Sequence, residues 1–183
     1  MKTYETKEII SLLLDKSKKN GATDTEVIIS KSYGKSLEVR SNVKEKIEEF
    51  DTFNIGIRVF EGKKFSILSI NKIDEKSLIN LAEKATEIAD ISPEDNFSGI
   101  ATKKDMANYP VNKEIKILTS DDFEPSIDQM EIKANEIEND ALNFSNKLVS
   151  DGVHVAWSKS KTYYANSNNF YDKHVKSNNL NSL

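Results

Sequence analysis

The sequence predicts an α+β protein, with an antiparallel β meander flanked by two helices, a long third helix and the start of a β-rich second domain. Apolar residues recur at helical spacing in three segments and alternate with polar residues in several others. The connections between the alternating segments are too short for parallel crossovers, so the strands are expected to be antiparallel. At 183 residues the chain is long enough for one well-buried core.

Three segments have the apolar stripe of an amphipathic helix, and residues that favour helix ends flank them. Thr6 is expected to cap the first helix and Gly21 to stop it, and Asp74 is expected to start the second. The three helices are predicted over Lys7–Asn20, Glu75–Ile88 and Ser126 to about Leu148.

Alternating or β-branched segments between the first two helices predict the meander. Lys44–Asp51 is rich in helix-favouring residues, but it is short and lies between strand signals, so it is expected to be a charged strand. Turns are expected at Tyr33–Lys35, at Asn42 and at Glu61–Lys63. The other predicted strands are Glu26–Ser32, Ser36–Arg40, Asn54–Phe60 and Lys64–Ile70.

The carboxy-terminal part of the sequence carries a weaker strand pattern. Two short strands, Val153–Trp157 and Thr162–Ala165, are expected to be joined by a turn at Ser158–Lys161. The tail from Asn166 is rich in Asn and Ser and has little to bury. The predicted organisation is an N-terminal α+β domain (1–92), an extended connector (93–125), and a helix with a β-hairpin (126–183).

Composition and charge exclude several classes of protein. The chain has no cysteine, which excludes disulfides, thiolate metal sites and cysteine nucleophiles. Net charge is -4 with scattered basic residues, so a nucleic-acid partner is not expected. The segment Met1–Lys7 lacks the apolar core of a signal peptide, and Ile9–Leu14 is too short to span a bilayer. A cytoplasmic protein with no membrane contact is therefore expected.

Several short motifs, in this order along the chain, resemble the TldD/PmbA family. Gly21–Val27 is similar to the point where the family's first helix ends and its first strand begins, and Gly56–Lys63 is similar to its glycine-started strand and hairpin. Tyr164–Phe170 resembles an Asn-Ser-x-Gly motif that closes a hairpin, with Asn169 at the usual glycine position. Further matches are Leu37–Arg40, Lys44–Glu49, Ala89–Asp95 and Gly99–Ala101; Ser92–Asp95 and the late Asn-Ser motif favour the PmbA (TldE) branch.

The resemblance implies relationship to a metallopeptidase system that trims peptides. In it, a TldD subunit carries a zinc-binding His-Glu-x-x-x-His helix in its carboxy-terminal half, and PmbA lacks this motif and pairs with TldD. Family members continue through a β-rich domain, so we expect this chain to be a shortened or split gene product, unless the coding region continues in one long reading frame. Zinc is expected only in a full-length catalytic partner, and no cofactor is expected in this chain.

The residues themselves offer no catalytic or metal site, and no binding residue can be assigned. Only two histidines, His154 and His174, are present, and neither lies in a zinc-binding helix motif. The adjacent carboxylates Glu48–Glu49 and Asp121–Asp122 are typical of solvated faces. No Gly-x-Ser-x-Gly turn or glycine-rich phosphate loop occurs. The aromatic residues Trp157, Tyr163 and Tyr164 could stack on a ligand, but core packing is the commoner role.

Two functional classes follow, and enzyme activity of the chain alone stays uncertain. The first is a non-catalytic, PmbA/TldD-like subunit that acts through a TldD-like partner or by self-association and meets peptide substrates through that complex. The alternative is a stand-alone peptide- or protein-binding domain that uses an exposed sheet edge. A decayed gene product without function is a third alternative.

Overall fold

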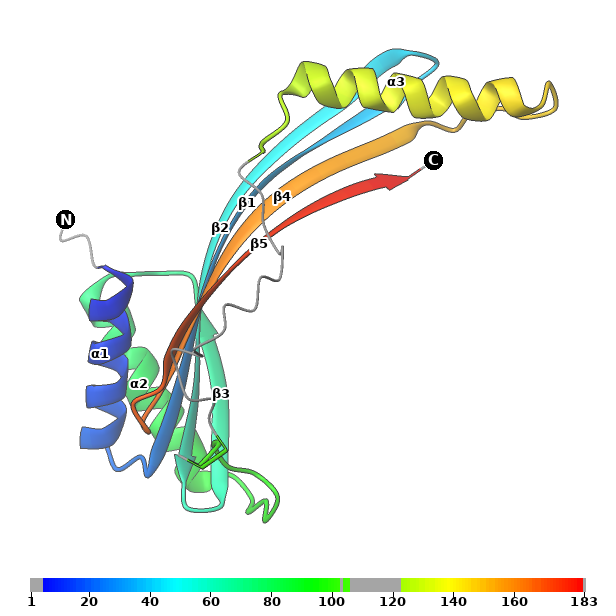
Figure 1. Ribbon diagram of the computed structural model, residues 1–183. Helices are drawn as coiled ribbons and strands as arrows, with labels where there is room; N and C mark the ends of the chain where they lie inside the picture. The colour runs from blue at the N-terminus through cyan, green and yellow to red at the C-terminus, as the bar shows by residue number, and fades with distance from the viewer. Residues whose placement is uncertain (1–4, 103, 106–122, 183) are drawn as a thin grey trace. The chain divides into compact units, whose positions relative to one another are not determined.

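The computed structural model describes residues 5–102, 104–105 and 123–182, which form three helices and one five-stranded sheet (Figure 1). The strand order is β3-β2-β1-β4-β5, and β2 and β3 pair antiparallel, so the predicted α+β fold with an antiparallel sheet and a long third helix is confirmed. The elements are α1 (Thr6–Lys19), β1 (Asp24–Arg40), β2 (Val43–Glu61), β3 (Lys64–Ile70), α2 (Glu75–Ile91), α3 (Ile127–Phe144), β4 (Val153–Asn166) and β5 (Tyr171–Ser182).

The described residues divide into two compact units, each built from several segments. The first unit contains residues 5–31, 53–102, 104–105 and 161–174, and the second contains 32–52, 123–160 and 175–182. The strands β1, β2, β4 and β5 each contribute residues to both units. The predicted division into 1–92, 93–125 and 126–183 stays a prediction.

In the first unit, α1 and α2 lie side by side against the sheet (Figure 1). Asp74 caps α2, as predicted, with its carboxylate accepting a hydrogen bond from the Ser77 amide at 2.9 Å. The cap of α1 is Glu5 rather than the predicted Thr6, and Gly21 follows the helix at φ 107°. The helices and strands bury a shared apolar core that includes Ile9, Leu13, Val27, Ile29, Ile55, Ile57, Leu78 and Leu81.

In the second unit, α3 packs on the strands through a smaller core. Its start at Ser126 forms a capping box with Gln129, in which each residue's side chain accepts a hydrogen bond from the backbone amide of the other. The helix ends at Phe144, four residues before the predicted end. The core contains Leu37, Val39, Met130, Ala134, Val153 and Val155.

Two predicted turns are wrong, because the chain continues as strand through both of them. β1 runs straight through Tyr33–Lys35, and β4 runs straight through Ser158–Lys161. Gly34 is needed for close approach rather than for a turn: a Cβ there would lie 2.5 Å from the Phe50 ring and 2.8 Å from the Trp157 carbonyl oxygen. The charged segment Lys44–Asp51 is a strand, as predicted, within β2.

The Asn- and Ser-rich tail forms a strand that was not predicted: Tyr171–Ser182 is β5, which lies beside β4. Of the predicted connector, residues 93–102 and 123–125 contain no helix or strand, and the Asp95 amide bonds the Lys63 carbonyl at 2.8 Å. Residues 103 and 106–122, including the Asp121–Asp122 pair, lie outside the described residues. None of the described helices has the length and apolar character required to span a bilayer.

Candidate functional site

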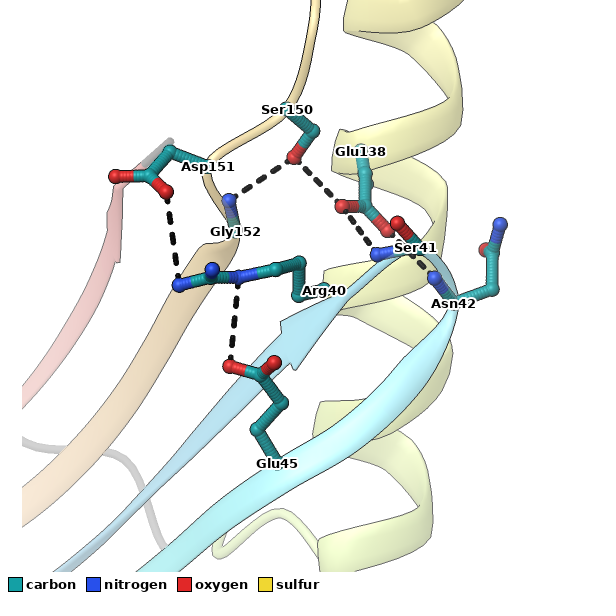
Figure 2. A network of polar contacts seen from close by, with 8 residues as sticks. All are labelled: Arg40, Ser41, Asn42, Glu45, Glu138, Ser150, Asp151 and Gly152. Atoms are coloured by element: carbon teal, nitrogen blue, oxygen red, sulfur yellow. Dashed lines mark hydrogen bonds and ion pairs between the residues drawn. The ribbon is translucent and has the colours of Figure 1, made fainter.

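The most developed polar network of the second unit surrounds a buried carboxylate, Glu138 of α3 (Figure 2). Its side chain has 0% exposure and accepts three hydrogen bonds. One oxygen accepts from the Ser41 amide at 2.9 Å and the Ser150 hydroxyl at 2.6 Å, and the other accepts from the Asn42 amide at 2.8 Å. Both carboxylate oxygens are therefore committed to donors from distant parts of the sequence.

The two amides belong to the tight turn between β1 and β2. Ser41 and Asn42 have φ values of 52° and 57°, the left-handed conformation that a two-residue hairpin turn requires at both positions. Asn42 also exchanges side-chain hydrogen bonds with Asn139 of α3 at 3.3 and 3.1 Å. The Ser150 hydroxyl accepts from the Gly152 amide at 3.0 Å, which joins the loop before β4 to the same network.

Arg40 lies at the edge of this network and bridges two carboxylates. Its guanidinium is 3.5 Å from Glu45 and 3.5 Å from Asp151 (Figure 2). All three side chains are well exposed, so solvent screens these ion pairs and they contribute little to stability.

The electrostatics of Glu138 indicate an ionised structural anchor. Burial raises the pKa of Glu138, but the hydrogen bonds from Ser150, Asn42 and Ser41 lower it by more, so its pKa lies below the usual value. Glu138 is fully buried and both of its oxygens accept hydrogen bonds from the protein, so a substrate proton cannot reach it without opening this network. The arrangement therefore fixes the hairpin turn against α3 rather than performing acid–base chemistry.

The first unit carries a polar cluster on the sheet face opposite its helices. Glu26 forms an ion pair with Arg58 and accepts a hydrogen bond from the Tyr164 hydroxyl at 2.6 Å. Burial, followed by the hydrogen bond to Glu26, raises the pKa of Tyr164. A shallow hollow of about 250 Å³ beside this cluster is also lined by Ile28 and Ile67, and its polar groups already satisfy one another.

The predicted Asn-Ser turn closes the β4–β5 hairpin. The buried Asn166 side-chain oxygen accepts hydrogen bonds from the Asn168 amide at 3.0 Å and the Phe170 amide at 3.2 Å. Asn169 has φ 65°, the conformation for which glycine is usual at this position. A polar cleft of about 440 Å³ lies between this turn and α1, lined in part by Asp15 and Lys18.

The candidate residues from the sequence do not come together in one site. His154 is half-buried in β4 within the second unit, and His174 is exposed in β5 within the first. Glu48 and Glu49 are exposed, with Glu48 paired to Lys46 at 3.0 Å.

The aromatic candidates pack against other residues of the protein, which is the commoner of the two roles considered for them, core packing and ligand stacking. Trp157 is buried and meets Tyr33 edge to face at 6.0 Å, and Tyr163 packs against the core of the first unit. Glu138 was not predicted as a site residue, because a buried glutamate on a helix cannot be distinguished by sequence pattern from an exposed one. Only the turn at Asn42 was a usable signal.

A metallopeptidase relationship implies a bound metal ion, and such an ion needs several donor side chains grouped together. Among the described residues, no three His, Asp or Glu side chains are grouped in a way that could hold a metal ion. This part of the chain therefore does not fit a catalytic zinc site.

Solved structures with the same fold come from three organisms. A candidate modulator of DNA gyrase from Bacteroides thetaiotaomicron matches with a TM-score of 0.81 at 18% identity, over 97% of this chain and 40% of that chain. TldE from Thermococcus kodakarensis matches with a TM-score of 0.68 at 15% identity, over 92% and 37%. A candidate modulator of a DNA gyrase from Thermotoga maritima matches with a TM-score of 0.67 at 15% identity, over 97% and 39%.

This chain thus spans about two fifths of the length of each of these structures. No curated protein matches the chain. Residues 25–89, which run from β1 to α2, match the family model described as PmbA/TldA metallopeptidase domain 1. Taken with the predicted motifs and the shared fold, this match confirms the predicted resemblance to the PmbA/TldD family over residues 25–89.

Proposed function

We propose that the chain is a non-catalytic component of a PmbA/TldD-type peptide-processing system and acts through a family partner. The observation that carries the proposal is the match of residues 25–89 to a metallopeptidase family domain. It is supported by the lack of a grouped metal-donor set in the part of the chain that the structure describes. In this proposal the partner supplies the zinc site, the peptide substrate is met through the complex, and the system works in the cytoplasm.

The PmbA (TldE) branch is the favoured place for this chain within the proposal. The sequence motifs Ser92–Asp95 and Asn166–Asn169 support that branch, and TldE from Thermococcus kodakarensis shares the fold. By the resemblance, members of this branch lack the zinc motif and pair with TldD.

Co-purification tests the proposal directly. The tagged chain is expressed with a full-length TldD-like subunit from the same organism, and with an unrelated zinc peptidase as the control. We expect the tagged chain to recover the TldD-like subunit stably and not to recover the control peptidase. Failure to recover it, or peptidase activity of the isolated chain that a chelator abolishes, would contradict the proposed non-catalytic partner role.

A second candidate function is a stand-alone peptide-binding domain, and one structural observation favours it. β3 pairs with β2 only from Ile55 to Glu61, so the other half of β2 is an outer strand of the sheet within the described residues. Main-chain groups on such an edge can accept an added strand.

A further inference from the structure

The outer edge of β2 in the second unit has the length and extension that strand addition requires. β2 runs from Val43 to Glu61, and its β3 pairing begins only at Ile55. Residues Val43–Thr52 belong to the second unit, where no other described strand lies outside β2 in the sheet order. The segment contains neither proline nor glycine, so no residue type in it interrupts main-chain pairing.

The side chains along this edge are exposed and carry a defined pattern of charge. Every residue from Glu45 to Thr52 is exposed. Because side chains alternate along a strand, Ile47, Glu49 and Asp51 share one face. The ion pair between Lys46 and Glu48 at 3.0 Å shows the same alternation on the other face.

Two carboxylates on the edge have no partner to neutralise them in the part of the chain that is described. Lys44 is paired with Glu131 of α3, and Lys46 is paired with Glu48. Glu49 and Asp51 form no ion pair with a described residue, although they lie two residues apart on an exposed face. An added strand would therefore meet two uncompensated negative charges beside the apolar side chain of Ile47.

The same pattern disfavours pairing between two copies of this edge. In an antiparallel pairing, residues directly opposite each other lie on the same face. Registers centred on Glu48 or Glu49 set a carboxylate against its own copy, and a register centred on Phe50 sets Glu49 against Asp51. Like charges directly opposite are destabilising, so a partner strand of opposite charge fits better than a second copy.

We propose that the outer edge of β2, from Lys46 to Thr52, binds an extended peptide segment that carries Lys or Arg at alternate positions. Main-chain hydrogen bonds hold the segment, and its basic side chains pair with Glu49 and Asp51. The inference rests on the second candidate function and adds the charge class of the peptide.

Peptide binding to the intact chain tests the inference by fluorescence anisotropy at low ionic strength. The probe is a labelled peptide of alternating lysine and threonine, long enough to span Lys46–Thr52. A glutamate–threonine peptide controls for charge, and the lysine peptide with N-methylated threonines keeps its charge but loses alternate amide donors. Binding of the lysine peptide, with clearly weaker binding of the other two, is expected.

Matched variants locate the binding surface. Glu49→Gln/Asp51→Asn should weaken lysine-peptide binding roughly twofold to thirtyfold, from two cross-strand charge pairs. Glu83→Gln/Glu87→Gln, on the exposed side of α2 in the first unit, changes net charge equally and should leave binding unchanged. Circular dichroism verifies that both variants fold as the parent chain does.

Three results would overturn the inference in distinguishable ways. Equal binding of the methylated and unmethylated lysine peptides would show attraction by charge without strand pairing. Equal binding of the lysine and glutamate peptides would refute the charge preference but leave edge binding as a function. Absence of binding by every peptide would refute both, and it would leave the co-purification test of the family-partner role unaffected.

Discussion

Replacing Glu138 by Gln should measurably destabilise the second unit. The amide keeps the size of the carboxylate and can retain the oxygen that accepts from Ser41 and Ser150, but its NH2 group then faces the Asn42 amide donor. One hydrogen bond to a charged acceptor is lost and two become neutral. Hydrogen bonds to charged groups contribute more than neutral ones, so the free energy of unfolding should fall by about 2 kcal/mol.

Urea unfolding followed by tryptophan fluorescence measures this change. Trp157 is the single tryptophan of the chain, and it is buried in the same unit as Glu138. Glu136→Gln is the matched control, because Glu136 is exposed on α3 and makes only a 3.4 Å ion pair with Lys133. That control should cost no more than about 0.5 kcal/mol.

The pH dependence supplies an independent check. Since the pKa of Glu138 is lowered in the folded protein, its stabilising contribution is present above the unfolded pKa and is lost as the pH falls through the folded pKa. The difference between the parent chain and Glu138→Gln should therefore be full at neutral pH and shrink below about pH 4. If Glu138→Gln and Glu136→Gln were equally stable at neutral pH, the anchoring role of Glu138 would be refuted.

Three further changes test the fold at single positions. Gly34→Ala sets a Cβ 2.5 Å from an aromatic ring and should lower the free energy of unfolding in urea by about 1–3 kcal/mol. Gly56→Ala approaches only the end of an exposed side chain, at 2.9 Å, and should lower it by less. The reverse order would contradict the packing described. Asp74→Ala removes the cap of α2 and should lower the free energy of unfolding by about 1 kcal/mol, with no change if the cap is unimportant. The pKa values of Tyr33 and Tyr164 are both raised above the usual value. Tyr164→Phe should therefore reduce, but not abolish, the high-pH step of an alkaline absorbance titration, and an unchanged step would contradict the raised pKa of Tyr164.

Local sequence patterns were sufficient for the helices and for the charged half of β2. The three helices follow from apolar spacing and end-capping residues, and Asp74 and Ser126 lie at the helix starts as expected. Lys44–Asp51 was placed as a strand by its neighbours, although its composition favours helix. These features depend on interactions between residues close in sequence.

The wrong predictions concern features that distant residues decide. Glycine is a typical turn residue, but at position 34 it is required because the Phe50 ring approaches too closely for a side chain. The tail from Tyr171 has weak strand propensity and becomes a strand by adding to β4. Glu138 meets Ser41, Asn42 and Ser150 only in the folded chain, so no local pattern could separate it from a surface glutamate.

The hydrogen bonds from the hairpin turn to Glu138 also fix the pairing register of β2. Because side chains alternate, a one-residue slip at Ser41–Asn42 would exchange the two faces of the strand that follows. Glu49 and Asp51 would then project from the opposite side, and an incoming strand would meet Glu48 and Phe50 in their place. A carboxylate inside α3 thus determines which side chains β2 presents on each face, so under the proposed edge binding a helix substitution that never touches the peptide would alter peptide selectivity.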